Sequence, residues 1–446
     1  MPVQLLGNLS NMAKVTTFKP TTAIAVIIAN MIGTGVFTSL GFQLLGIQSG
    51  FVILMLWIVG GITALCGALT YAELGSAMPR SGGEYNFLSH IYHPVAGFTS
   101  GWISSTIGFS APTALAAITF GSYLSAVCPF FSSTYLALGI LVVMALVHSS
   151  NRKNSGSMQF VFTLIKILLI VVFCLLGLFL INEPQPINFL PVTGDLTLIF
   201  SSTFAVSLIY VNYAYNGWNA ATYISSELEE PQKSLPMILV SGTLIVTFCY
   251  VLLNYVFLYT APVEELVGNV EIGVISAQHI FGDVGAKIMG ATLSLLLVST
   301  VSAMTLAGPR VLQVIGEDFS TFKLLAVTNK DGVPSRAIFF QTSIAIIFVL
   351  TSSFESILVF SGFALALNNF FAVAGIFVLR FKQPNLERPY KTWLYPVPPL
   401  LYISITMWTL GYILIQRPTE AGMSLGIIAV GMLLYYFTTK VEVRKK

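Results

Sequence analysis

Two short stretches of polar residues and glycine interrupt long apolar runs in this chain. The first is IIANMIGTGVF, residues 27–37, and the second is YVNYAYNGWNA, residues 210–220. Unwinding a helix in hydrocarbon leaves backbone groups unpaired at several kcal/mol each, so a break persists only where protein, water or a ligand replaces the lost hydrogen bonds. Both stretches are therefore candidates for a ligand site.

The chemistry that these breaks offer is that of two opposed helix ends. A half-helix restarting near Gly35 presents free N–H groups and a positive dipole end, which suit a carboxylate, and Gly33 and Gly35 let the ligand approach the backbone. The hydroxyl of Thr34 adds a donor. A half-helix ending near Tyr213 presents carbonyl oxygens and a negative dipole end, which suit an ammonium group. Facing each other, the two ends would bind a zwitterion.

The two stretches share a fixed offset along the chain. Asn30 and Asn212 are 182 residues apart, and so are Gly35 and Gly217. The stretches lie in the first and sixth predicted spans, an offset of five, so the two helices run in opposite directions, and matching breaks in inverted halves are typical of transporters with a site at the membrane midplane. Glycine and small residues also serve as packing faces between membrane helices. The common offset favours a binding site over that alternative.

The elements that must position these breaks are membrane-spanning helices. The chain has 446 residues, of which 55% are hydrophobic and 9% charged, with a mean hydropathy of +0.84. These values indicate an all-α integral membrane protein. Twelve spans are predicted, near 21–46, 51–78, 95–127, 134–149, 157–181, 198–228, 235–261, 286–315, 336–353, 356–380, 393–415 and 421–439. They form one domain, with inverted repeats at about 20–182 and 197–381 and two added helices at about 393–439.

The distribution of basic residues predicts the orientation. Eighteen of the 21 Lys and Arg residues fall on the side of the two termini, Lys287 and Arg417 fall on the other, and Lys166 lies inside a span. This bias predicts a multi-pass protein of the cell membrane with both termini in the cytoplasm. The net charge of +3 then reflects topology and requires no nucleic-acid partner.

Lys166, in FVFTLIKILLI, is the one basic residue well inside a span. We expect its ammonium to tie carbonyls of the broken first span to hydroxyls of the eighth, where VSTVSAM supplies Ser299, Thr300 and Ser302. An ammonium fixed there would replace a bound sodium ion. The alternatives are snorkelling of the side chain to the interface and, because burial disfavours the charged form, coupling to protons.

Other side chains limit the kind of ligand that the site can bind. Spans 1, 3 and 8 and the first half of span 6 contain no Asp or Glu, so the ligand's side chain is predicted to be neutral, although aromatic rings could hold a cation. Tyr213 is our candidate for an aromatic lid over the site. The histidines form no cluster, and we expect no metal, no cofactor and no catalytic constellation. A sensor that binds the same ligand without moving it has the same sequence features.

Seven motifs follow one another along the chain: IIANMIGTGVF, YAELGSAMPRSGGEYNFLSHIYHPVAGFTSGW, APT, YAYNGWNAATYISSELEEPQKSLP, CYVLLN, AGPRV and VLRFKQPNLERPYKTWLYPVPP. In these motifs and their order the chain resembles the L-amino acid transporter group of the amino acid–polyamine–organocation superfamily, in its bacterial form, and the resemblance covers most of the chain. It implies the LeuT-type fold of five plus five inverted helices, with helices 1 and 6 broken and a bundle that rocks against a scaffold.

The resemblance also implies roles for the residues at the breaks. The substrate carboxylate would bind at Thr34 and Gly35. The substrate ammonium would bind the carbonyl oxygens of Met31, Tyr213 and Ala214.

Further roles follow from the same resemblance. Asn216 would border the side-chain pocket, Lys166 matches a lysine that accompanies sodium independence, and Tyr250 would lie near that lysine. Animal members join a glycoprotein heavy chain through a cysteine between spans 3 and 4. Cys128 lies in that loop, but its surroundings, AVCPFF, differ, so we expect no heavy chain and a structural role for Cys128.

These observations together predict a sodium-independent secondary transporter of neutral L-amino acids, an exchanger that works by alternating access in the lipid bilayer. The alternatives are proton-coupled uptake and exchange of a cationic amino acid or amine. An enzyme is not expected.

Overall fold

A computed structural model describes residues 19–150, 155–330 and 332–445. In this part of the chain, ten helices are long and apolar enough to cross a membrane. The predicted all-helical membrane fold is therefore confirmed. The two remaining predicted spans are the 17-residue helix α15 and the 14-residue helix α10, which ends at a break. The uninterrupted spanning helices are α3 (Gly50–Ala77), α7 (Ser133–Ser150), α8 (Ser155–Leu180), α11 (Pro231–Thr260), α15 (Ser335–Thr351), α16 (Phe354–Lys382), α17 (Val397–Gln416) and α18 (Pro418–Lys445).

Both predicted breaks are present. The first span consists of α1 (Pro20–Met31) and α2 (Gly35–Gln43), with a non-helical link at residues 32–34. The sixth consists of α10 (Ser202–Tyr215), a link at residues 216–219, and the 3-10 helix η3 (Ala220–Glu227). Glycine and asparagine occupy the links, where residues of low helix propensity cost little.

A third interruption was not predicted. The third span is divided into α5 (Pro94–Ile103), a short π-helical stretch η2 (Ser104–Gly108) and α6 (Ser110–Val127). Such π-bulges inside helices often mark functional sites. The interruption places Phe109 at a bend rather than on a regular helical face.

The eighth span is longer than predicted. Helix α13 runs over Ile272–Asp318, and Gly282, with φ of 71°, divides a short N-terminal part from the spanning part. Only glycine adopts that backbone conformation without strain, because other residues carry a Cβ atom that clashes there.

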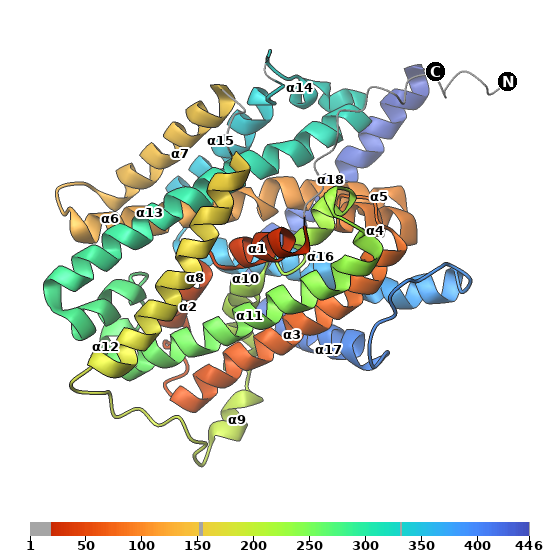
Figure 1. Cartoon of the computed structure of the whole chain (residues 1–446). Helices are drawn as coiled ribbons and strands as arrows, with labels where there is room; N and C mark the ends of the chain where they lie inside the picture. The colour runs from red at the N-terminus through yellow and green to blue at the C-terminus, as the bar shows by residue number, and fades with distance from the viewer. Residues whose placement is uncertain (1–18, 151–154, 331, 446) are drawn as a thin grey trace.

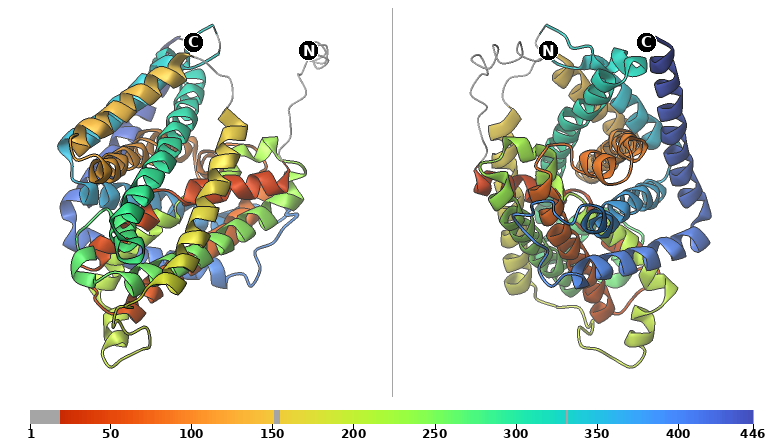
Figure 2. Two further views of the ribbon diagram at one scale, coloured as in Figure 1. Left: turned by 60° about the vertical axis from the view of Figure 1, so that its left-hand side comes forward. Right: turned by 90° about the vertical axis from the view of Figure 1, so that its right-hand side faces the viewer.

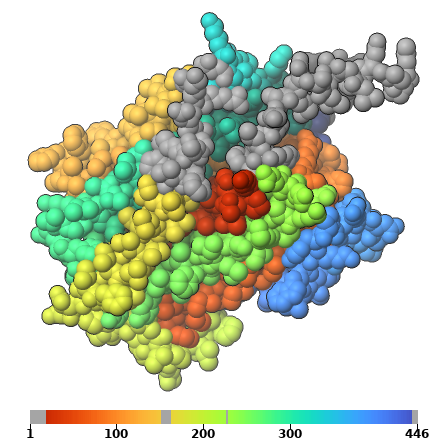
Figure 3. Space-filling view, viewed as in Figure 1, coloured from red at the N-terminus to blue at the C-terminus, as the bar shows by residue number. Residues whose placement is uncertain are grey.

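The helices surround the broken segments (Figure 1). Helix α1 packs against α8 and α11, α3 packs along α11, and α13 packs along α6. In the space-filling view, α8 and α11 lie side by side across one face (Figure 3). These helices carry exposed apolar side chains, among them Leu164, Leu168 and Phe248, which suit contact with lipid. The connection through α9 (Asp195–Ile199) lies at one end of the molecule, and α14 (Lys323–Ala326) lies at the other (Figure 2).

Candidate functional site

The two breaks pack directly against each other. A Cβ atom on Gly35 would lie 2.7 Å from the Cα of Ala214, and one on Gly217 would lie 3.0 Å from the carbonyl carbon of Asn30. Gly217 also has a φ of +108°, which favours glycine. The glycines therefore let each break approach the helix end of the other, as two opposed helix ends require.

Tyr250 of α11 joins the carbonyl ends of the two broken helices. Its hydroxyl lies 2.5 Å from the carbonyl oxygen of Met31 and 3.0 Å from that of Ala214. We expected Tyr250 near Lys166, and the two side chains contact the carbonyls of consecutive residues, Met31 and Ile32. Because a carbonyl oxygen has two lone pairs, those of Met31 and Ala214 can each still accept a hydrogen bond from a ligand.

Lys166 of α8 is buried and bonded inside the protein. Its side chain is 4% exposed, and Nζ donates to the carbonyl oxygen of Ile32 at 3.2 Å and to Oγ1 of Thr300 at 2.9 Å. The snorkelling alternative is therefore wrong. The ammonium ties the first break to α13, as the sequence predicted.

Of the three hydroxyl residues predicted on α13, Thr300 meets the ammonium. Ser299 is buried on the same helix. The prediction for Ser302 was wrong, because its hydroxyl pairs with Nε2 of His148 at 2.8 Å. Residues two apart on a helix are separated by about 200°, so Thr300 and Ser302 face different neighbours.

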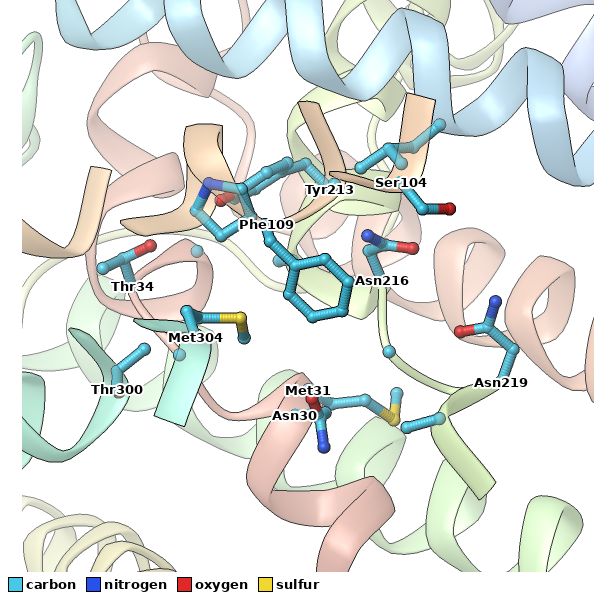
Figure 4. A pocket seen from close by; sticks show the side chains of 18 of the residues that line it. Asn30, Met31, Thr34, Ser104, Phe109, Tyr213, Asn216, Asn219, Thr300 and Met304 are labelled. Atoms are coloured by element: carbon cyan, nitrogen blue, oxygen red, sulfur yellow. The ribbon is translucent and has the colours of Figure 1, made fainter. Parts of the chain in front are cut away.

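All six residues predicted to bind substrate line one cavity (Figure 4). They belong to the first break and to the end of α10: Met31, Thr34, Gly35, Tyr213, Ala214 and Asn216. Thr300 also lines this cavity, so the partner of Lys166 borders the predicted site.

Several lining residues were not singled out from the sequence. They come from the third span, from the link before η3 and its first turn, and from α13 and α16: Ser104, Phe109, Pro112, Asn219, Tyr223, Met304, Leu365, Asn368 and Asn369. Figure 4 shows the ring of Phe109 between Met304 and Asn216. Two adjacent amides in the apolar run ALNNFF were a signal that could have identified α16.

The cavity combines helix-end dipoles with uncharged side chains. None of the described residues that line it is Asp, Glu, Lys, Arg or His. The first turn of α2, starting at Gly35, offers N–H groups and a positive dipole end, whereas the ends of α1 and α10 offer carbonyls. The arrangement can bind a small zwitterion, and it lacks a side-chain counter-ion for additional charge.

A helical membrane protein with two broken helices that meet around such a cavity has the architecture of a secondary transporter. The chain belongs to the amino acid permease family, whose model matches residues 18–434.

Similar proteins include transporters from bacteria and mammals. The chain is 29% identical over 421 residues to the serine/threonine exchanger SteT of Bacillus subtilis, covering 93% of this chain and 94% of that protein. It is 28% identical over 430 residues to the mouse large neutral amino acids transporter small subunit 2, covering 93% and 79%. It is 26% identical over 425 residues to the human b(0,+)-type amino acid transporter 1, covering 93% and 86%. The protein is thus a multi-pass membrane protein for amino acid transport, and not an enzyme.

Proposed function

We propose that this protein is a sodium-independent exchanger of neutral L-amino acids that works by alternating access. The observation that carries the proposal is the uncharged cavity between opposed helix ends, which complements the two charges of an amino acid backbone and no third charge. A charged side chain would find no charged group among the described lining residues, and burying an unpaired charge costs several kcal/mol.

The substrate carboxylate binds at the start of α2, to the N–H of Gly35 and the hydroxyl of Thr34. The ammonium binds the carbonyl oxygens of Met31, Tyr213 and Ala214. Support comes from the placement of all these residues on one cavity and from the close approach of Gly35 to Ala214. Asn216, next to Tyr213, borders the space for the side chain.

Sodium independence rests on Lys166. Its ammonium lies between the carbonyl oxygen of Ile32 and the hydroxyl of Thr300, two oxygen atoms of the kind that bind sodium. A covalently attached cation there performs the structural task of a bound ion. Proton coupling through Lys166 is the second candidate, because Lys166 is a titratable group in direct contact with the first break.

The proposed orientation of the protein in the membrane places both termini in the cytoplasm. The excess of Lys and Arg on the side of the termini supports cytoplasmic termini, although residues 1–18 and 446 lie outside the described part. Cys128 is a half-buried free thiol at the end of α6, and we propose that it is structural and that no heavy chain is required.

The test is flux in liposomes that contain the purified protein. Labelled alanine should enter only when the liposomes contain an amino acid, and replacing sodium by choline should not change the rate. A neutral amino acid such as leucine should compete with alanine, whereas arginine should not. Entry into empty liposomes that follows an imposed pH gradient would favour proton coupling and reject exchange.

A further inference from the structure

A buried carboxylate lies directly behind one wall of the cavity. Glu84, in the first turn of α4 (Glu84–Ile91), has 0% exposure and does not itself line the cavity. Gly82 and Gly83, with φ of 118° and 51°, bring the chain under η3, where a Cβ on Gly83 would lie 2.8 Å from the ring of Tyr223. The SGGE part of the motif PRSGGEY thus delivers a carboxylate to this wall.

Three side chains donate hydrogen bonds to this carboxylate. Oε1 of Glu84 accepts from the hydroxyl of Tyr71 at 2.8 Å and from the amide nitrogen of Asn219, and Oε2 accepts from the hydroxyl of Tyr223 at 2.6 Å. Among the residues that the structure describes, Glu84 forms no ion pair. Neutral donors therefore satisfy the group.

The hydrogen bonds to Glu84 determine which polar atoms of this wall face the cavity. Asn219 turns its NH2 group toward Glu84 and Tyr223 commits its single hydrogen to it, because both donate to the carboxyl oxygens. Both residues line the cavity. Figure 4 shows the amide oxygen of Asn219 turned toward the cavity. Ser104 also pairs with the Tyr223 oxygen, so what remains for a ligand at this wall is the Asn219 oxygen and the remaining lone pair of the Tyr223 oxygen, both acceptors.

We propose, building on the exchange of neutral amino acids proposed above, that Glu84 is a positioning residue that selects substrates whose side chains carry an O–H or N–H donor. A donor side chain pairs with the acceptor wall, whereas an apolar side chain of equal size desolvates it without compensation. Glu84 achieves this without touching the substrate, by fixing the hydrogen positions of Asn219 and Tyr223.

Threonine and valine provide the first measurement, because they are nearly equal in size and differ by one hydroxyl. In liposomes that exchange labelled alanine, unlabelled threonine should compete at least about 10-fold better than valine, since an unpaired buried acceptor costs about that factor. O-methylserine, which keeps the oxygen but lacks the hydrogen, should compete at least about 10-fold less well than serine. Equal competition within either pair overturns the proposal.

The variant Glu84→Gln tests whether Glu84 causes the preference for threonine over valine. The glutamine oxygen can still accept from Tyr71 and Asn219, but its NH2 group replaces Oε2 and donates to Tyr223, whose hydrogen is then free to face the cavity. The threonine-to-valine preference should fall to within about 3-fold while alanine exchange persists. An unchanged preference in this variant overturns the role of Glu84.

Glu355→Gln is the matched control. Glu355 also accepts from a tyrosine hydroxyl, that of Tyr210 at 2.6 Å, but neither residue lines the cavity, so the preference should stay as in the wild type. If Glu84→Gln does not yield folded protein, Tyr223→Phe removes one acceptor and should lower the same ratio. Absence of exchange for every amino acid in the folded wild type would reject the proposed function, whereas alanine exchange without a threonine preference would reject only this inference.

Discussion

Replacing Lys166 by methionine tests the central structural link of the site. Methionine is close to the lysine stem in length and volume but has no ammonium, so the carbonyl oxygen of Ile32 and the hydroxyl of Thr300 lose their common donor. Ile32 lies in the non-helical link between α1 and α2, at the break that carries the proposed carboxylate site. We expect Lys166→Met to loosen that break and weaken transport.

The size of the expected loss of transport follows from the two hydrogen bonds that Lys166 donates. A hydrogen bond from a charged donor contributes about 1.5–3 kcal/mol, and the Ile32 oxygen is left in a buried position without its donor. If the ordered break is required for binding, kcat/KM for alanine exchange should fall by about 10- to 150-fold. Stability should change in the other direction or not at all, because burying an ammonium without a counter-ion costs several kcal/mol that methionine avoids.

The assay combines alanine exchange in liposomes with thermal unfolding of the same preparation in detergent. Lys233→Met is the matched control: that side chain is 78% exposed and forms only a surface pair with Glu230, so both readouts should match the wild type. Wild-type values of kcat and KM in Lys166→Met would refute the reasoning. A loss of exchange that accompanies a fall in the unfolding temperature would show that the ammonium maintains the fold rather than the site.

Three further outcomes are expected from the same measurements. Gly35→Ala should reduce exchange by about 5- to 150-fold, because its Cβ would lie 2.7 Å from backbone and side-chain atoms of the end of α10, and relieving that overlap costs about 1–3 kcal/mol. Glu73→Gln should lower the unfolding free energy by about 3 kcal/mol and reduce the unfolding temperature, since it leaves Arg380, bonded to both Glu73 oxygens at 2.9 and 2.7 Å, without its counter-ion. Ser302→Ala should leave exchange within about 2-fold of wild type, because its partner is His148 and not the ammonium of Lys166; a loss comparable to that of Lys166→Met would contradict this assignment.

The prediction of the two broken helices from sequence succeeded for a local reason. Glycine, asparagine and threonine in a long apolar run are unfavourable in the middle of a membrane helix, and hydropathy already placed that helix in the bilayer. The shared offset of Gly35 and Gly217 added a relation between the two stretches. The end of α10 at Tyr215 and the restart at Gly35 therefore fall within two residues of the predicted positions.

The contacts across helices were predicted less well. Lys166 was assigned correctly to the first break and to α13, but which hydroxyl it meets depends on the rotation of α13, which an apolar pattern on both sides does not determine. Tyr250 was expected near the lysine, and its hydroxyl contacts the carbonyl of Met31, next to the Ile32 carbonyl that Lys166 bonds. Its second contact, with the carbonyl of Ala214 at the other break, was not predicted from the sequence.

The sequence by itself determined the membrane setting, the helical class and the positions of the two breaks, because each depends on residues that are neighbours in the chain. Only the tertiary structure decided which helices close the cavity, since Phe109, Asn219 and Asn369 are brought together from three separate spans. It also decided the hydrogen-bonding character of one wall. Glu84 orients Asn219 from a position 135 residues earlier in the chain, and no local pattern encodes that contact.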